Sequence, residues 1–448
     1  MNKEIFAFNS NSDIYDKLIL ILTVFLPLSL CLSIFIADLF ASIIALITLI
    51  LILYKKKLTE CLSIVRKPLG IILFFYFIIL ISLIFSSNFK LSFLPSFFYF
   101  RYILLSLGIF YLIYKYEFTI KIISISLLSI LGLIFIDSIY DFLKIHQIFG
   151  LSVEESRVGK PSANIVTSFF GEEKKLGSFI VRLLPFITSI IIISNIKILE
   201  NNFFKKFSIE SILLIVAGTI IFLTSERTAM FLYIFFFITS LRVLPKRLLI
   251  VSVLSFVMII LFFTQKDLTR KYINATLFQF QLIEHQRDDF TNFNNLNFSN
   301  LKYISEVHEK LIKVGFEIFK ESPLTGSGVK TFEKKCNELK KKNPDFICST
   351  HPHNTYIQII SDIGFFGVII ILFIFLYIFY LNVTIFFRKN LSNLLKSFYL
   401  LNLGIIVNLM PFVPSGSFFN NWMNLVIYLP IGYWLYLYFK IKKSEINL

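Results

Sequence analysis

Residues 355–387 read TYIQIISDIGFFGVIIILFIFLYIFYLNVTIFF and contain a single charged side chain, Asp362. This apolar stretch is longer than the roughly 17–25 residues that a helix needs to cross the hydrocarbon core of a bilayer. Similar runs occur along the rest of the chain, so the same reasoning extends to the whole protein. We therefore predict an all-α, polytopic membrane protein.

Apolar runs of comparable character divide the chain into three regions, with about 12 transmembrane helices in total. Residues 1–263 would hold the first nine spans and a smaller outer loop at 141–176. Residues 264–354 would form one large outer loop, and residues 355–448 the last three spans. The runs are Leu18–Ile36, Leu39–Tyr54, Leu69–Phe85, Leu94–Tyr114, Ile120–Ile139, Gly177–Ser194, Ile209–Leu223, Thr228–Leu244, Leu248–Phe263, Thr355–Phe387, Phe398–Val413 and Trp422–Phe439.

The composition excludes a soluble enzyme. The 448 residues are 56% hydrophobic and 16% charged, whereas soluble domains have about 25% charged residues. The net charge of +16 would suggest nucleic acid binding in a soluble protein. Here the basic residues gather in alternate short loops, such as 55–57 and 388–389, while the opposite short turns hold only Lys90 and Arg227. This positive-inside pattern predicts two cytoplasmic termini, long loops outside, and no nucleic acid partner.

The large loop contains an amphipathic pattern that predicts a helix on the outer face. Apolar residues recur there at spacings of three and four, and Glu321-Ser322-Pro323 then stops the pattern before a Gly-rich turn at 325–328. Loops of this length usually carry function. The recurring residues are Leu301, Ile304, Val307, Leu311, Val314 and Ile318.

Three arginines lie in or beside apolar runs on the predicted outer side. Arg101 is about two helical turns into its run, Arg182 about one turn into its own, and Arg227 is at an outer turn. One guanidinium group can donate two hydrogen bonds to a phosphate group. Three arginines at one depth in the membrane would therefore suit a diphosphate. The alternative is structural, because a membrane arginine often pairs with an acid or reaches for the interface. The available acids are Asp38, Asp137, Glu226 and Asp362.

The segment STHPHNT at 349–355 makes His353 the main catalytic candidate. Ser or Thr followed by Pro favours a helix start, so His353 is expected in the first turn of the helix that follows. A helix N-terminus disfavours imidazolium and attracts anions, which suits a neutral general base beside a phosphate. The alternative is a histidine that caps the helix or contacts a headgroup. All five histidines fall in predicted outer loops: His146, His285, His308, His351 and His353.

Cys336 and Cys348 lie on the predicted oxidising side, just before this segment. A disulfide between them would brace the approach to His353, with two free thiols as the alternative. Their spacing with His351 and His353 matches no standard zinc site. No phosphate-binding loop or dinucleotide motif is present. We therefore expect neither a metal nor a cofactor.

Several motifs together resemble the O-antigen ligase / O-antigen polymerase family of bacterial membrane proteins. His353-Asn354 followed by Gly364 and Gly367 resembles the family signature. The segment PLTGSGVKTF at 323–332 is similar to a turn of the family, and TSERTA at 224–229 to its Ser-x-Arg-x-Ala motif. FFGEEKKLGS at 169–178 resembles the sixth-span entry of polymerase members.

The resemblance implies a metal-independent, inverting glycan transferase in the bacterial inner membrane. Such an enzyme moves an oligosaccharide from undecaprenyl diphosphate on the periplasmic face. Its acceptor is a second lipid-linked glycan in polymerases and the lipid A core in ligases, while related members glycosylate proteins. His353 would be the catalytic histidine and Arg227 would bind the diphosphate, assisted by Arg182 or Arg101. The supporting residues would be Asn354, His308, His351, Gly364 and Gly367.

Two alternatives stay open at this stage. Many family members have an arginine at the start of the loop helix, where this chain has His308, so Arg270 or Arg287 are other candidates for the second phosphate contact. A non-enzymatic transporter of lipid-linked glycans would also explain arginines inside spans. It would predict paired broken helices and internal symmetry, and the sequence indicates neither.

Overall fold

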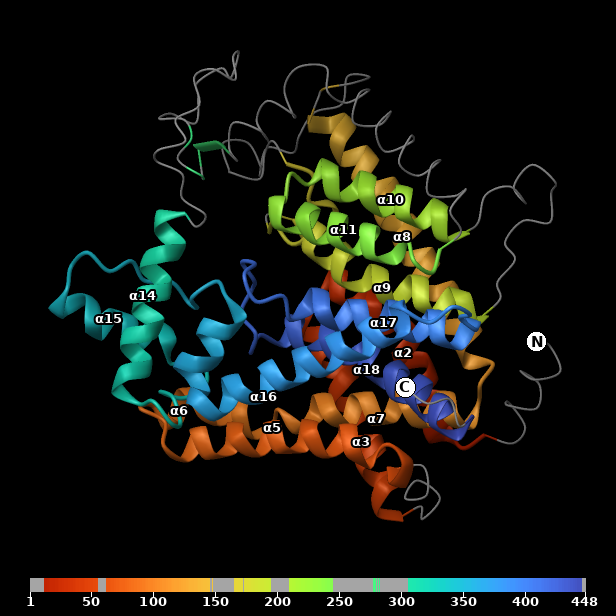
Figure 1. Cartoon of the computed structure of the whole chain (residues 1–448), viewed down its shortest axis with the longest axis horizontal. Coiled ribbons are helices and arrows are strands. Elements are labelled where there is room, and N and C mark those ends of the chain that lie inside the picture. Colours follow the sequence, from red (N-terminus) through yellow and green to blue (C-terminus); the bar gives the residue numbers. More distant parts are fainter. Residues whose placement is uncertain are drawn as a thin grey trace.

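The structure, a computed structural model, describes residues 12–54, 62–145, 147, 165–171, 173–194, 209–244, 277, 278, 280, 282 and 305–444. Over these residues the chain is helical without a strand, which confirms the predicted all-α class (Figure 1). Outside the described residues lie the apolar run 248–263 and the candidates His146, His285, Arg270 and Arg287.

The first part of the chain forms α2 (Ile14–Leu32), α3 (Ile34–Tyr54), α5 (Arg66–Ile84), α6 (Phe89–Phe97), α7 (Phe100–Lys115) and α8 (Thr119–Ile145). The middle part forms α9 (Leu176–Ser194), α10 (Ile209–Leu223), α11 (Arg227–Ser240), α14 (Glu306–Glu321) and α15 (Phe332–Lys342). The last part forms α16 (Thr355–Phe386), α17 (Asn393–Asn408) and α18 (Asn421–Lys443).

In the described ranges, 7 segments are long and apolar enough to cross a membrane, where α6 and α7 count as one. The protein is therefore a multi-pass membrane protein, and the total of about 12 spans stays a prediction. α10 and α11 are apolar but shorter. The 7 segments are Ile14–Leu32, Ile34–Tyr54, Arg66–Ile84, Phe89–Lys115, Thr119–Ile145, Leu176–Ser194 and Thr355–Phe386.

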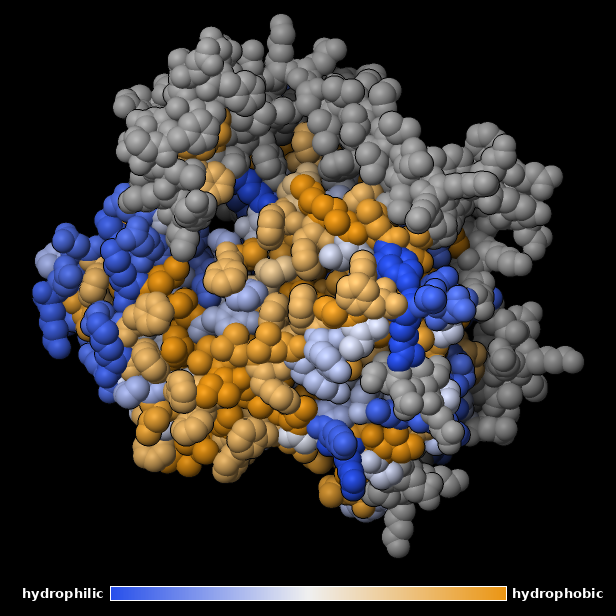
Figure 2. All heavy atoms as spheres, viewed as in Figure 1, coloured by the Kyte–Doolittle hydropathy of each residue, from blue (hydrophilic) through white to orange (hydrophobic). Residues whose placement is uncertain are grey.

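One face of the molecule is largely hydrophobic between two hydrophilic ends. Figure 2 shows apolar side chains across the face of α5 and α16, with hydrophilic ones over α14 and α15 and again at the opposite end. Phe74, Phe366 and Leu376 are among the exposed apolar residues. Apolar patches of this size are rare on soluble monomers, and they fit contact with lipid chains.

The polar contacts between helix ends define two opposite ends of the bundle. At one end, Lys115 Nζ lies 2.6 Å from Asp16 Oδ2, so α7 ends where α2 begins. At the other end, Arg101 at the start of α7 pairs with Asp38 near the start of α3. We call this second end, where α7, α9, α11, α16 and α18 also begin, the site end.

α16 is interrupted at Gly364, whose φ of 75° and ψ of −166° lie outside the helical region. The turn at 323–328 fills the interruption, and Ser82 Oγ also donates to Asp362 O at 2.8 Å. The backbone groups freed by the break find partners in this turn, as a membrane helix requires. Three hydrogen bonds of 2.9 Å form this turn–helix joint: Ser327 N to Ser361 O, Gly328 N to Asp362 O, and Phe365 N to Pro323 O.

Candidate functional site

The start of α16 is fixed by Asn354, which is its N-cap residue. The Asn354 side chain accepts hydrogen bonds from Tyr356 N at 3.0 Å and Ile357 N at 3.1 Å. Its amide group donates to Pro411 O at 2.7 Å. His353 therefore precedes the helix, and its expected place in the first helical turn is wrong. Asn is among the strongest N-cap residues, so the helix starts after Asn354 and not near Thr350-His351-Pro352.

His353 takes a left-handed backbone conformation, with φ of 54°. Its carbonyl oxygen accepts from Ser415 N at 2.9 Å, which ties it to the segment between α17 and α18. This conformation is uncommon for a residue with a side chain and persists only where the surroundings hold it. The fold thus fixes His353 at a defined place on the site end.

Three histidines gather at this point, which sequence spacing alone did not predict. The His351 ring centroid lies 4.2 Å from that of His353, and the His308 centroid lies 5.8 Å from it. Ser349 Oγ lies 3.3 Å from His353 Nε2. His308 belongs to α14, where Ser305 caps the helix and places its Oγ 2.6 Å from His308 Nδ1.

Arg227, the first residue of α11, lies close enough to His308 for its charge to act on that imidazole. Burial lowers the pKa of His308, and the positive charge of Arg227 lowers it further. Burial also lowers the pKa of His353, with a smaller contribution from His308. Burial and then His353 lower the pKa of His351 to about 4. All three imidazoles are therefore neutral near pH 7, as a general base requires.

Glu226, the residue before Arg227, ties the start of α11 to the N-terminus of α9. The Glu226 carboxylate accepts from Gly177 N at 2.7 Å and from Ser178 N at 3.0 Å. Burial raises the pKa of Glu226 to about 7, against the opposing effect of the two amides and of Arg182. Arg182 is thus close enough to the Glu226 carboxylate to act on it electrostatically.

Arg182 is a buried residue of α9, with 3% of its surface exposed. Its Nη1 donates to Asn408 Oδ1 at 2.8 Å, and its Nε donates to Ser178 Oγ at 3.2 Å. Neutral oxygens receive these two hydrogen bonds. Arg182 is the seventh residue of α9, so this buried cation lies toward the site end of the helix.

An apolar groove runs from Arg182 and Asn408 between five helices. Its walls come from α5, α9, α16, α17 and α18, and Arg182 and Asn408 are its polar residues at the site end. Phe75, Phe186, Ile374 and Tyr428 are among the lining residues. Such a groove can hold a hydrocarbon chain whose charged head lies at Arg182.

Arg101 lies apart from the histidines. Its Nη2 lies 2.9 Å from Asp38 Oδ1 and also donates to Tyr102 OH at 2.8 Å. Asn421 Nδ2 donates to Asp38 Oδ2 at 3.2 Å. Of the two readings that the sequence left open, pairing with an acid is the one that this geometry shows for Arg101.

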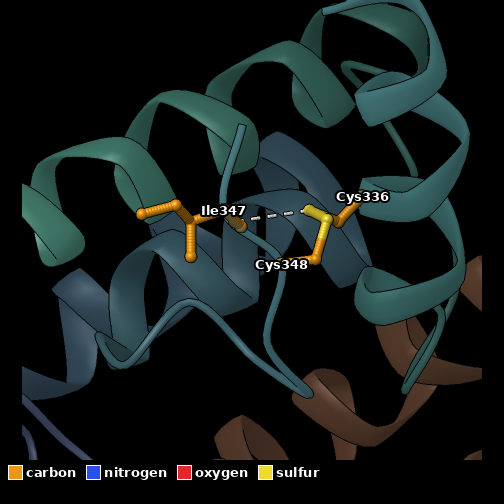
Figure 3. Close-up of a disulfide and its surroundings, with 3 residues drawn as sticks. All are labelled: Cys336, Ile347 and Cys348. Carbon is orange, nitrogen blue, oxygen red and sulfur yellow. Dashed lines mark hydrogen bonds between the residues drawn. A yellow bond between two sulfur atoms is a disulfide. The ribbon is translucent and has the colours of Figure 1, made fainter. Parts of the chain in front are cut away.

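Cys336 and Cys348 form a disulfide, which joins α15 to the segment leading to His353 (Figure 3). The carbonyl oxygen of Ile347 lies 3.5 Å from Cys336 Sγ. Cys336 packs with Leu311 and Ile318 of α14, so the disulfide connects the helix that carries His308 with the chain that carries His353. Within the described part of the chain, no group of three or more His, Cys, Asp or Glu could hold a metal ion.

The sequence motifs did not reveal the role of the segment 409–420, which contacts both His353 and the first turns of α16. Gln358 Nε2 donates to Ser417 Oγ at 3.0 Å, and Phe418 N donates to Gln358 Oε1 at 2.8 Å. The only available signal was the polar character of PSGSFFNN at 414–421 between two apolar runs.

Gly364 lies in the turn–helix joint, while Gly367, three residues on, lies against Ile363 within α16.

The comparison with known families agrees with this geometry. Residues 212–372 match the family model described as O-Antigen ligase, and this range includes Arg227, His308 and His353. No curated protein matches the chain. Members of the matched family are glycosyltransferase-like membrane enzymes that process O-antigen glycans. This match over residues 212–372 supports the resemblance to the O-antigen ligase family that the sequence motifs indicate.

Proposed function

We propose that this protein transfers an oligosaccharide from undecaprenyl diphosphate to a glycan acceptor, as an O-antigen polymerase or O-antigen ligase. The observation that carries the proposal is the cluster of the neutral imidazoles of His308, His351 and His353, with the positive charge of Arg227 acting on His308. These residues come from three different helices or helix starts. A cation beside a neutral base suits a reaction that breaks a bond to a phosphate and deprotonates a hydroxyl.

The groove and the arginines would bind the donor. Its polyprenyl chain would lie among the apolar side chains, with its diphosphate at the Arg182 end. Arg227 would contact the diphosphate from above, and Arg182 would add a buried positive charge. Because Arg101 already pairs with Asp38, Arg182 is the better candidate for the second donor contact.

The reaction would follow from these positions. His353 accepts the proton of the acceptor hydroxyl, whose oxygen attacks the anomeric carbon of the donor sugar. The bond from that carbon to the phosphate oxygen breaks, and its electron pair leaves with the diphosphate. Arg227 stabilises the charge that develops there. Attack from the face opposite the leaving group inverts the anomeric centre, and no metal or cofactor takes part.

The site end would face the periplasm of a bacterial inner membrane, with both termini in the cytoplasm. Two observations support this orientation. The Cys336–Cys348 disulfide lies at the site end, and disulfides persist in oxidising compartments. The opposite end carries Lys115 and the lysines of the last turn of α18, as the positive-inside rule requires of a cytoplasmic face.

A cell-surface glycan assay tests the proposal. A deletion strain is complemented with wild-type protein, His353→Ala, Arg227→Ala, or the exposed control Lys334→Ala. Wild type and Lys334→Ala should restore the glycan, whereas the first two variants should not, at equal amounts of inserted protein. Normal glycan with His353→Ala would contradict the mechanism.

The glycan of the deletion strain identifies the acceptor. Single repeat units on the cell surface would indicate a polymerase, which the sixth-span entry motif favours. Long polymer left on the lipid carrier would indicate a ligase. Unglycosylated protein alone would indicate a protein O-oligosaccharyltransferase, and lipid-linked glycan retained on the cytoplasmic face would indicate a transporter.

A further inference from the structure

Ser349 lies beside the imidazole ring of His353, close before it in the chain. Its Oγ is 3.3 Å from His353 Nε2. The other ring nitrogen, Nδ1, has no hydrogen bond partner within the described part of the chain, and it is not among the buried polar atoms that lack one. The two nitrogens of this imidazole are therefore in different surroundings: the protein contacts Nε2, and Nδ1 is open to a ligand.

The two members of this pair are anchored independently of each other. Ser349 directly follows Cys348, which the disulfide joins to Cys336 of α15. His353 has a left-handed backbone, and its carbonyl oxygen accepts from Ser415 N at 2.9 Å. A contact between two side chains whose backbones are already held needs little further ordering, so it can fix the orientation of the ring.

The residues between Ser349 and His353 restrict the imidazole further. Pro352 is buried and its φ is fixed by its own ring, which stiffens the link. The His351 ring centroid lies 4.2 Å from that of His353, so the two rings pack together. A half-turn of the His353 ring would exchange Nε2 for a carbon atom beside Ser349 Oγ. The hydroxyl therefore favours one of the two ring orientations.

This contact has a chemical consequence for a neutral histidine. Such an imidazole has a proton on one nitrogen and a lone pair on the other, and the hydrogen bond of one nitrogen decides which is protonated. A base needs its lone pair on the nitrogen that a substrate can reach, which is Nδ1 in His353. The proton is then on Nε2, where Ser349 Oγ can accept it.

We propose that Ser349 is the positioning residue of His353: its Oγ accepts a hydrogen bond from Nε2–H and leaves Nδ1 as the nitrogen that takes the acceptor's proton. This inference rests on the proposed transfer function. The proton of the acceptor hydroxyl moves to Nδ1, and the electron pair of that O–H bond forms the new bond to the anomeric carbon. The Nε2–H bond stays intact, and its hydrogen bond to Ser349 becomes stronger because the donor is now an imidazolium.

The other titratable and charged groups around His353 are the same in any variant of Ser349. They are His351 of the same segment, His308 of α14, and Arg227 of α11, whose charge acts on His308. The segment 409–420, which contacts the His353 backbone, contains no titratable side chain. A change in the titration of His353 can therefore be assigned to the hydroxyl.

Ser349→Ala tests the inference, and Ser349→Thr is the conservative variant that keeps a hydroxyl. The full-length protein in phosphatidylcholine nanodiscs is modified with diethyl pyrocarbonate, which reacts with neutral imidazole, over a series of pH values. Fragmentation of the peptide by mass spectrometry distinguishes His353 from His351. The midpoint of the His353 titration should fall by about 0.5–1 pH unit in Ser349→Ala, because the lost hydrogen bond favours the imidazolium.

Two variants should titrate like wild type. Ser349→Thr should keep the His353 midpoint within about 0.2 pH unit. The matched control is Ser194→Ala, which removes a hydroxyl that bonds to Ile191 O at 3.0 Å within its own helix, at the other end of α9. In transfer assays, Ser349→Ala should lower kcat about tenfold and leave the donor KM within about twofold, while Ser349→Thr should recover at least about half of the rate.

The inference is overturned if the His353 midpoint in Ser349→Ala equals or exceeds that in Ser194→Ala. A serine with only a structural role would lower the unfolding temperature without moving this midpoint. The measurement does not depend on turnover. Absence of transfer by wild type would instead contradict the proposed function, and the two failures are therefore distinguishable.

Discussion

Gly364→Ala tests whether the turn–helix joint holds the two halves of the site together. Gly364 has φ of 75° and ψ of −166°, a region that is open to glycine and closed to other residues. A Cβ at this position would lie 2.3 Å from Leu324 O and 2.7 Å from Gly326 N. Both obstacles are backbone atoms, so no side-chain rotation can relieve the contact.

The size of the effect follows from what the joint contains. The unfavourable backbone conformation costs about 1–3 kcal/mol. Displacing the turn also breaks the three backbone hydrogen bonds of the joint, at about 1 kcal/mol each. We expect Gly364→Ala to lower the free energy of unfolding by about 4–6 kcal/mol, a large part of the usual 5–15 kcal/mol.

The functional loss should be greater than the loss of stability suggests. The joint directly follows α14, which carries His308, and it docks this segment onto the helix that follows His353. A shift of about 1 Å between catalytic groups can reduce a rate about 100-fold. We therefore expect transfer activity of Gly364→Ala to fall at least 100-fold even below its unfolding temperature.

The assay compares thermal unfolding in detergent, followed by tryptophan fluorescence, with proteolysis of the 322–331 turn. Gly70→Ala is the matched control, because a Cβ on this glycine of α5 meets nothing within 4 Å. It should unfold at or slightly above the wild-type temperature. Equal unfolding temperatures and equal protease resistance for Gly364→Ala and Gly70→Ala would refute the reasoning.

Four further predictions concern the surroundings of His353. Asn354→Ala removes the N-cap of α16 and the bond to Pro411, so it should cost about 1–2 kcal/mol in thermal unfolding, whereas Asn354→Asp should keep the cap and recover about half. Because the pKa of His353 is lowered in the folded protein, its imidazole stays neutral over a wider pH range than a free histidine. The transfer rate should therefore be constant from pH 8 to about 6.5 and fall only in more acidic buffer. A rate that begins to fall above pH 7 would contradict this. Stability should also fall with acidification. An unfolded histidine takes up a proton near pH 6.5, whereas folded His351 does so only near pH 4, so acidification across that interval should lower the unfolding temperature. His351→Gln should flatten this dependence of the unfolding temperature on pH. Reduction of Cys336–Cys348 should cost about 3 kcal/mol and expose the loop at 343–350 to protease, while Cys31→Ser should respond to reductant as wild type does.

The sequence predicted features that depend on local pattern. Long apolar runs predicted the all-α class and most of the helices, and the spacing of Leu311, Val314 and Ile318 predicted the buried face of α14. The proximity of Arg227 to His308 was not predicted, because no local pattern relates residues so far apart in the chain.

The features that the sequence did not predict depend on contacts between distant residues. Asp38 contacts both Arg101 and Asn421, although Asp38 and Asn421 are 383 positions apart in the chain. Without this contact, the sequence could not show which acidic residue pairs with Arg101. The break in α16 depends on a turn some forty residues earlier in the chain, so the apolar run alone could not place it at Gly364. The place of His353 was missed because two capping signals, one at Thr350 and one at Asn354, compete within five residues.

Transfer by purified protein tests the central claim most directly. The protein is reconstituted in liposomes with undecaprenyl-diphosphate-linked glycan and acceptor, in the presence of EDTA and without nucleotide, and the product is resolved by glycan length. We expect wild type and Lys334→Ala to form product, and His353→Ala and Arg227→Ala to lose at least 100-fold of the rate while remaining folded. Product formed by His353→Ala at the wild-type rate would contradict the account.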